Sequence, residues 1–126
     1  MSERLQWIEH KGKRILVVKF AGIKEEKEYL EAIVELEREI LRQPKRQLVP
    51  LVMDVSDTNL TRAVADRAKQ MMEKAKAKGI PDSPVALVGL AGAQKAIVFA
   101  MQVVRPDIHL AASPDEAKEW MVKRLK

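Results

Sequence analysis

The chain contains no cysteine, which excludes disulfides, thiolate metal ligands and cysteine nucleophiles. Histidine is scarce as well, because only His10 and His109 occur among the 126 residues and they lie far apart in the sequence. A metal site or a catalytic triad built on histidine therefore has few donors. No catalytic motif occurs along the chain, so we expect no enzymatic activity, no cofactor and no bound metal.

Long apolar runs are missing too. The uncharged stretches from Gln47 to Met53 and from Ser83 up to Lys95 are far shorter than the roughly 20 apolar residues of a membrane-spanning helix. The first residues alternate charged and apolar types and do not resemble a secretory leader. These absences predict a cytoplasmic protein without a transmembrane segment.

Glycine, proline and aromatic residues are few, with 5 Gly, 6 Pro and 4% aromatics, so the composition is neither disordered nor collagen-like. The remainder, 47% hydrophobic and 33% charged, is typical of a globular protein. A chain of this length buries roughly two-thirds of its unfolded surface, which is enough for a core without disulfides. We expect one domain over residues 1–126. Lys and Arg outnumber Asp and Glu by 23 to 18, for a net charge of +5.

Hydrophobic patterns predict five strands that alternate with helices after an opening hairpin. The expected strands cover 4–10, 14–20, 48–55, 85–90 and 107–112. Apolar residues at three- and four-residue steps predict helices over 24–42, 61–78 and 93–104, and a last helix after Ser113. Ser113 can cap that helix, with Pro114 at its first position and Glu116 returning a bond to the cap. This order predicts an α/β fold with a mixed five-stranded sheet, first antiparallel and then parallel, and about four helices.

Several segments together resemble a STAS domain, the family of anti-sigma-factor antagonists and sulfate-transporter tails. They are the opening hairpin, the strand LVPLVMDV that ends in Asp54-Val55-Ser56, and the strand VALVGLAG. The closing stretch carries an acidic-Ala-x-x-Trp pattern at Glu116–Trp120. In this it resembles small free-standing STAS-like proteins, whose fold is shared by CRAL-TRIO lipid-binding domains. The resemblance implies a regulatory role through protein contacts.

Polar residues gather where the third expected strand ends and the next helix begins: Asp54, Ser56, Asp57, Thr58, Asn59, Thr61 and Arg62. Ligands and partners favour this carboxyl edge in open α/β sheets. Anti-sigma-factor antagonists usually carry here an Asp-Ser-Ser-Gly-like motif that a kinase phosphorylates, and this chain has hydroxyl residues without that motif. A phosphate on Thr58 or Thr61 would lie near a helix N-terminus, which favours negative charge. The structural alternative is that these residues only cap the helix.

Three other features each allow two interpretations. Gly92 and Lys95 are candidates for binding an anion, the alternative being a tight turn between strand and helix. The second expected helix is basic and would attract acidic partners, anionic lipids or nucleic acid, unless it is a solvated face. Methionines on apolar helix faces fit either an adaptable pocket or an ordinary core: Met71, Met72, Met101 and Met121.

The sequence therefore predicts a non-enzymatic regulatory module of the anti-sigma-factor-antagonist type. Its partner would be a regulatory protein, such as a kinase or a signalling protein, docked at the loop after the third strand and the start of the second helix. A carrier of a small apolar or lipid-like ligand is the alternative. A homodimer fits a small domain of this kind, and no nucleic-acid motif occurs. These predictions require Val55 and Leu90 to lie at one rim of the sheet.

Overall fold

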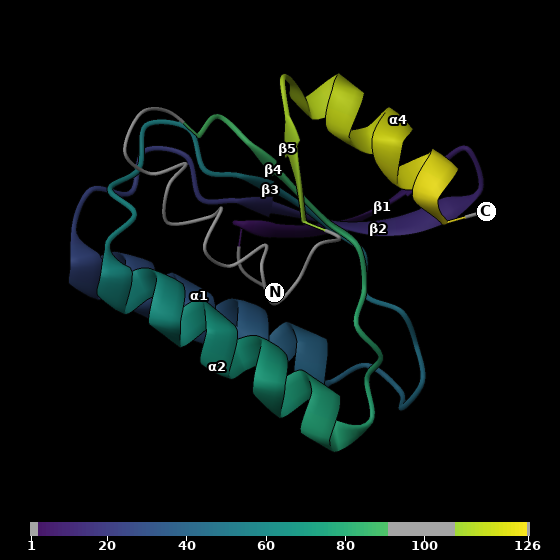
Figure 1. Cartoon of the computed structure of the whole chain (residues 1–126), viewed down its shortest axis with the longest axis horizontal. Coiled ribbons are helices and arrows are strands. Elements are labelled where there is room, and N and C mark those ends of the chain that lie inside the picture. Colours follow the sequence, from purple (N-terminus) through teal and green to yellow (C-terminus); the bar gives the residue numbers. More distant parts are fainter. Residues whose placement is uncertain (1–2, 91–107, 126) are drawn as a thin grey trace.

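Five strands form one mixed sheet in the computed structural model, which describes residues 3–90 and 108–125 (Figure 1). The strands are β1 (Leu5–His10), β2 (Lys13–Lys19), β3 (Leu51–Asp54), β4 (Val85–Val88) and β5 (Ile108–Ala111). The helices are α1 (Glu26–Leu41), α2 (Arg62–Lys78) and α4 (Pro114–Arg124). The helix expected over 93–104 lies outside the described residues. The other predicted elements are confirmed, with bounds that differ by a few residues.

A two-residue turn sets the register of the opening hairpin. Lys11 and Gly12 both have a positive φ, 50° and 81°. Two such residues make the type I′ turn, whose twist matches that of the flanking strands. β1 therefore pairs antiparallel with β2, with Leu5 opposite Val18.

The other strands run parallel and lie in the order in which they occur along the chain, β2-β3-β4-β5. β3 is shorter than expected: it begins at Leu51, so residues 48–50 of the expected strand lie before it. Pro50 has no N–H for the ladder and contributes only its carbonyl, which accepts a bond from the N–H of Leu16 at 2.9 Å. β3 and β4 are mostly buried, which explains their apolar sequence on both faces.

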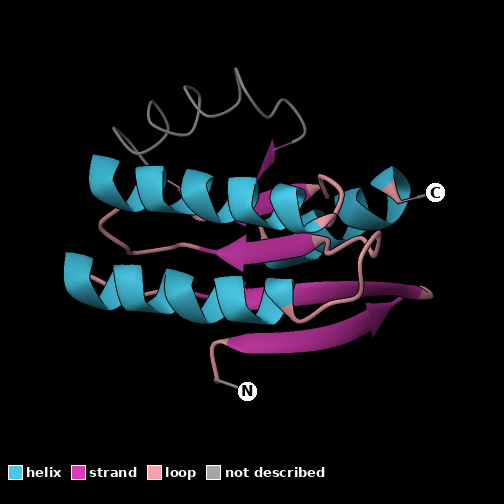
Figure 2. Cartoon of the chain, turned by 90° about the horizontal axis from the view of Figure 1, so that it is seen from below, coloured by secondary structure: helices cyan, strands magenta, loops and turns pink. Residues whose placement is uncertain are grey.

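The described helices α1, α2 and α4 cover the two faces of the sheet unequally. α1 and α2 lie side by side on one face, as right-handed crossovers require, and α4 lies on the other (Figures 1 and 2). The larger buried cluster lies under α1 and α2 and includes Phe20, Leu36 and Val64. A smaller cluster under α4 consists of Ile15, Val52, Ala86, Val88, Ala117 and Met121. Neighbouring residues of β2 serve both clusters, since side chains alternate across a strand.

Two glutamates of α1 are buried, and both are paired. Glu37 accepts bonds from Arg67 at 2.7 Å and from Lys74 at 3.4 Å, both on α2. The hydrogen bond from Arg67 is the main cause of a lowered pKa of Glu37, and burial opposes it. Glu39 accepts a bond from the indole N–H of Trp7 at 2.9 Å. These carboxylates therefore hold α1 against both α2 and β1.

The start of α4 follows the predicted cap in part. Ser113 accepts a bond from the N–H of Glu116 at 3.1 Å, and Pro114 occupies the first turn. The carboxylate of Glu116 lies instead 3.0 Å from Nε2 of His109, so the predicted return bond to the cap is wrong. The ring of His109 stacks on Trp120 with centroids 4.6 Å apart. β5 thus offers Glu116 a partner that the local sequence does not reveal.

Candidate functional site

The turns after β3 and β4 lie next to each other at one rim of the sheet. Asp54 is the register partner of Val88, and the N–H of Val55 donates to the carbonyl of Val88 at 2.9 Å. The chain after β2 joins the same rim, because Gly22 donates its N–H to the carbonyl of Ser56 at 3.0 Å. The predicted common rim is therefore confirmed.

Gly89 and Ser56 make a close contact across this rim. Its φ is 89°, and a β-carbon added there would lie 2.5 Å from Oγ of Ser56 and 2.7 Å from its Cα. Real β-carbons do not come so close to backbone atoms, so only glycine fits between the two turns. The turn after β4 and the turn after β3 are consequently one packed unit.

Asp54 and Ser56 are used within the turn that they form. Oδ1 of Asp54 accepts bonds from both the N–H and the hydroxyl of Ser56, the former at 3.0 Å. Asp57 follows with a φ of 54°, a conformation that aspartate tolerates better than most residues. Its carboxylate is exposed and contacts the ammonium of Lys24. Of these three polar residues, Asp57 is the one that faces solvent.

Thr58 is buried rather than displayed. It is 6% exposed, and its hydroxyl donates to the carbonyl of Val55 at 2.7 Å. It also forms a side-chain hydrogen bond with Tyr29 of α1. Burial raises the pKa of Tyr29, and the bond to Thr58 opposes part of that shift. Thr58 therefore joins the loop to the interior, where a kinase would not reach its hydroxyl.

Thr61 caps α2, as the structural alternative predicted. Its hydroxyl oxygen accepts a bond from the N–H of Val64 at 3.3 Å and donates to Glu26 at 2.6 Å. Asn59 is held through its backbone, where its N–H donates to the carbonyl of Ile23 at 3.1 Å. The side chains of Asn59 and Arg62 remain exposed. The surface of the loop thus consists of Asp57, Asn59 and Arg62.

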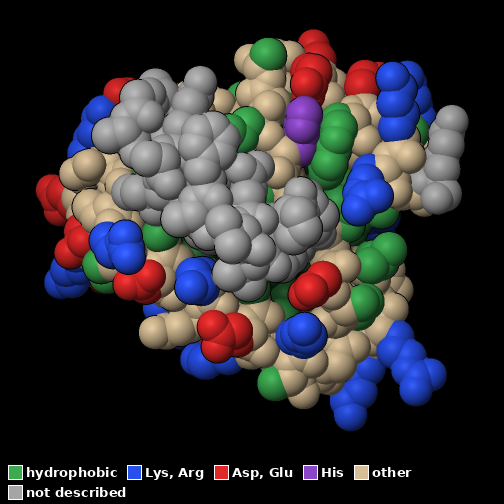
Figure 3. All heavy atoms as spheres, viewed as in Figure 1, with side chains coloured by type: hydrophobic (Ala, Val, Ile, Leu, Met, Phe, Trp, Pro, Cys, Tyr) green, Lys and Arg blue, Asp and Glu red, His purple; other side chains and the backbone are tan. Residues whose placement is uncertain are grey.

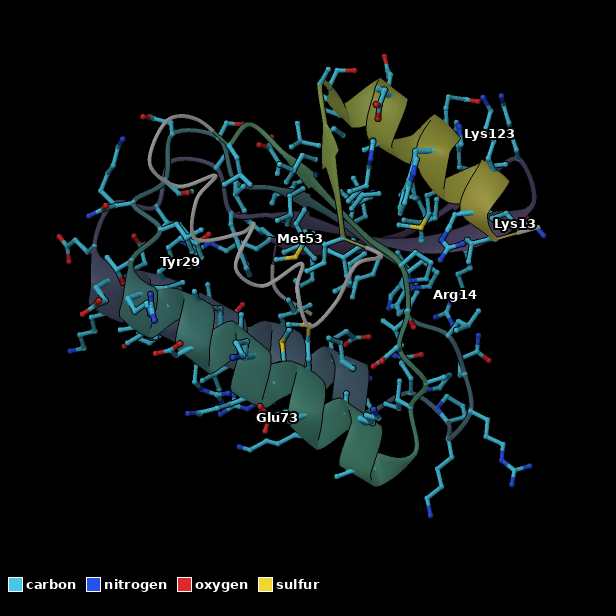
Figure 4. The ribbon with its side chains drawn as sticks, in the orientation of Figure 1. Lys13, Arg14, Tyr29, Met53, Glu73 and Lys123 are labelled. Atoms are coloured by element: carbon cyan, nitrogen blue, oxygen red, sulfur yellow. The ribbon has the colours of Figure 1, made fainter. Side chains whose placement is uncertain are left out.

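An apolar cavity of about 80 Å³ lies beneath this loop, between the sheet and the two helices. Its described walls come from β3, β4, β5, α1, α2 and the flanking loops, and they include Tyr29 and Met53, which lie between the helices and the sheet (Figure 4). A second cavity of about 40 Å³ adjoins it toward the C-terminal end of α2. Four of the described residues line both cavities: Leu51, Met71, Met72 and Val85.

The methionines separate into different places. Met71 and Met72 are part of the wall shared by the two cavities, whereas Met121 is packed in the cluster under α4. Met101 lies outside the described residues, as do the two anion-binding candidates Gly92 and Lys95. Of the four methionines, Met71 and Met72 thus line a cavity, and Met121 belongs to an ordinary core cluster.

Both histidines contact carboxylates of α4. Nε2 of His10 lies 3.1 Å from Glu119, which also pairs with Lys11 at 2.7 Å. The hydrogen bond from Lys11 is the main cause of a lowered pKa of Glu119, and the hydrogen bond with His10 lowers it further. Within residues 3–90 and 108–125, no three His, Asp or Glu side chains are grouped so that they could hold a metal ion. No helix in these same ranges is long and apolar enough to cross a membrane.

No protein-family model matches the chain, and a search of curated proteins found no match. A search of solved structures found the crystal structure of an uncharacterized protein of the DUF3478 family, with a SpoIIAA-like fold, from Shewanella loihica PV-4. It superposes with a TM-score of 0.64 over 93% of this chain and 91% of that chain. The fold is SpoIIAA-like. At 15% sequence identity the likeness shows the fold alone.

The SpoIIAA-like fold confirms the STAS resemblance at the level of architecture. Sequence reasoning located the loop residues of this SpoIIAA-like domain but not the contact between Tyr29 and Thr58, which lie on different elements. It also missed the aliphatic walls of the cavity, such as Leu87 and Ile108. Such residues carry no signal in sequence, since an apolar side chain facing a cavity looks like any core residue.

Proposed function

We propose that this chain is a non-enzymatic binding protein that holds a small apolar ligand between the sheet and helices α1 and α2. The observation that carries the proposal is the cavity of about 80 Å³, whose described lining is apolar apart from the hydroxyl of Tyr29. An empty apolar space of that volume costs about 2 kcal/mol of folding free energy, at about 24 cal/mol per Å³. A ligand of matching shape would restore the missing contacts.

The methionine wall supports an elongated ligand. Met71 and Met72 lie between the two cavities, and methionine side chains change rotamer readily to fill irregular space. If their thioethers turn aside, the two spaces become continuous. A short alkyl chain would then extend from the rim of the sheet toward the C-terminal end of α2.

Thermal unfolding in the presence of straight-chain alkanols of increasing length tests this proposal. We expect the Tm to rise with chain length until the cavity is filled. Ala68 lines the cavity, so Ala68→Leu should fill part of it and abolish the rise. Ala63→Leu is the control, because Ala63 is exposed on the same helix. Ligand binding would be contradicted if no alkanol changed the Tm of the wild type. It would also be contradicted if alkanols raised the Tm of Ala68→Leu and of Ala63→Leu by the same amount.

A regulatory docking role is the second candidate. The exposed side chains Asp57, Asn59 and Arg62 support it, because they are presented by a turn that Gly89 and Ser56 hold rigidly in place. We propose that a regulatory protein docks there, as anti-sigma-factor partners would. The contact between Tyr29 and Thr58 connects this loop to the cavity wall, so an occupied cavity would favour one loop conformation over another.

Pull-down with quantitative mass spectrometry tests the docking role. The variant Asp57→Asn, Asn59→Ala, Arg62→Ala removes the exposed groups while Asn at 57 keeps the positive φ accessible. We expect it to lose proteins that the wild type captures. The control Lys118→Ala, Lys123→Ala changes α4 on the other face of the sheet. Capture of the same proteins by the wild type and the loop variant would contradict docking at this loop.

A further inference from the structure

Two loops meet at the end of α2 that lies away from the rim. The N–H of Arg46, in the loop after α1, donates to the carbonyl of Gly79 at 2.9 Å, and the side chain of Lys45 packs 3.6 Å from the space where a β-carbon of Gly79 would lie. Lys76 and Lys78 occupy the last turn of α2 beside them. We call this group, Lys45, Arg46, Lys76 and Lys78, the basic corner.

The four cations of the basic corner have no anionic partner among the described residues. Some other cations on the described surface do form ion pairs, as Arg4 does with Glu28 and Lys24 with Asp57. Lys76 and Lys78 complement the C-terminal end of the helix dipole. That explanation does not extend to Lys45 and Arg46, which lie outside the helix. Lys and Arg side chains project from this part of the surface, at the lower right of Figure 3.

Two features of the corner are unfavourable for folding. Arg46 has a φ of 67°, in the left-handed region, which is unfavourable for a residue with a β-carbon. Leu48, two residues later, is 40% exposed and is the exposed large hydrophobic residue among those described. A basic loop residue in the left-handed region, followed two residues later by an exposed leucine, fits a loop that contacts another molecule.

We propose that the basic corner is a docking surface for an acidic segment of another protein, with the exposed Leu48 in the same loop as an apolar contact. Protein interfaces commonly combine an apolar centre with a charged rim, and opposite charge on the partner speeds association. Sequence-independent binding of single-stranded nucleic acid usually relies on aromatic side chains that stack on bases. The described aromatics lie elsewhere, in the core or against Arg14 and His109. A single leucine also buries little area in a membrane.

Fluorescence anisotropy with a short labelled peptide of repeating Glu-Glu-Leu tests this proposal on the full chain. We expect the wild type to bind it, and Lys45→Glu with Lys78→Glu to weaken binding by about tenfold or more. The control Lys13→Glu with Lys123→Glu changes the net charge equally on the α4 side of the sheet (Figure 4). We expect it to bind nearly as well as the wild type. Leu48→Ser should weaken binding of this peptide but not of repeating Glu-Glu-Ser.

Several results would overturn the proposal. If the two double variants, Lys45→Glu with Lys78→Glu and Lys13→Glu with Lys123→Glu, lost peptide affinity equally, net charge alone would explain the binding. Tighter binding of poly-uridine RNA or of phosphatidylserine vesicles would assign the corner to a different class of partner. NMR shift mapping on the wild type does not depend on any variant, and peptide-induced shifts centred away from residues 44–48 and 76–80 would contradict the site. A failure of alkanols to bind would not affect the peptide-binding result, because none of the four cations of the basic corner lines either apolar cavity.

Discussion

Substituting Gly89 with alanine tests the packed rim directly. The new β-carbon would lie 2.5–2.7 Å from atoms of Ser56, one of them the backbone Cα, so the two turns must separate. The positive φ of 89° adds a conformational cost. We expect about 1–2 kcal/mol from the backbone and about 1–3 kcal/mol from the steric displacement, a loss of about 2–5 kcal/mol in the free energy of unfolding.

Gly22→Ala is the matched control for Gly89→Ala. Gly22 has nearly the same φ, 85°, but nothing lies within 4 Å of the position of its β-carbon. Only the conformational cost then applies. Urea denaturation followed by circular dichroism gives both losses at one pH, with the m-value as a check for two-state unfolding. Equal losses for the two variants would refute the inference that the turns after β3 and β4 act as one unit.

Two further predictions concern polar contacts that fix the helices. Glu37→Gln removes the partner of Arg67 and Lys74, so we expect a loss of about 1–3 kcal/mol at pH 7 in urea denaturation. The pKa of Glu37 is lowered in the folded chain, so its stabilisation is present above the ordinary glutamate pKa and declines as the pH falls through the folded value. The two unfolding curves should therefore converge in acid, and a constant difference would be contrary evidence. Ser113→Ala should cost about 1 kcal/mol through loss of the cap of α4, and an unchanged urea midpoint would show that the cap is dispensable.

Local sequence signals were sufficient for most of the fold. The glycine of the Lys11-Gly12 turn, the period of the apolar residues in α1 and α2, and the Ser113-Pro114 cap are all set by neighbours in the chain. Strand ends were less predictable. Leu48 belongs to a β-rich run but lies outside β3, because Pro50 interrupts the ladder at that point.

The candidate site was predictable in position but not in use. The sequence placed seven polar residues between the end of the third strand and the start of α2, yet it does not show which of them form hydrogen bonds within the domain. Thr58 bonds to a carbonyl and to Tyr29, and Thr61 serves as a cap. Those roles depend on tertiary partners in α1 and in the turn itself. The exposed group Asp57, Asn59 and Arg62 emerges only after these contacts are known.

The unequal covering of the sheet has a consequence for how the domain opens. Among the residues that the structure describes, the cluster under α1 and α2 contains nineteen buried residues, against six under α4. The ion pairs of α4, from Glu119 and Glu116, lie near the surface, where each contributes little. The C-terminal segment should accordingly detach in sub-global fluctuations while the parallel strands stay assembled. Its amide hydrogens would then exchange with solvent at free energies well below that of complete unfolding.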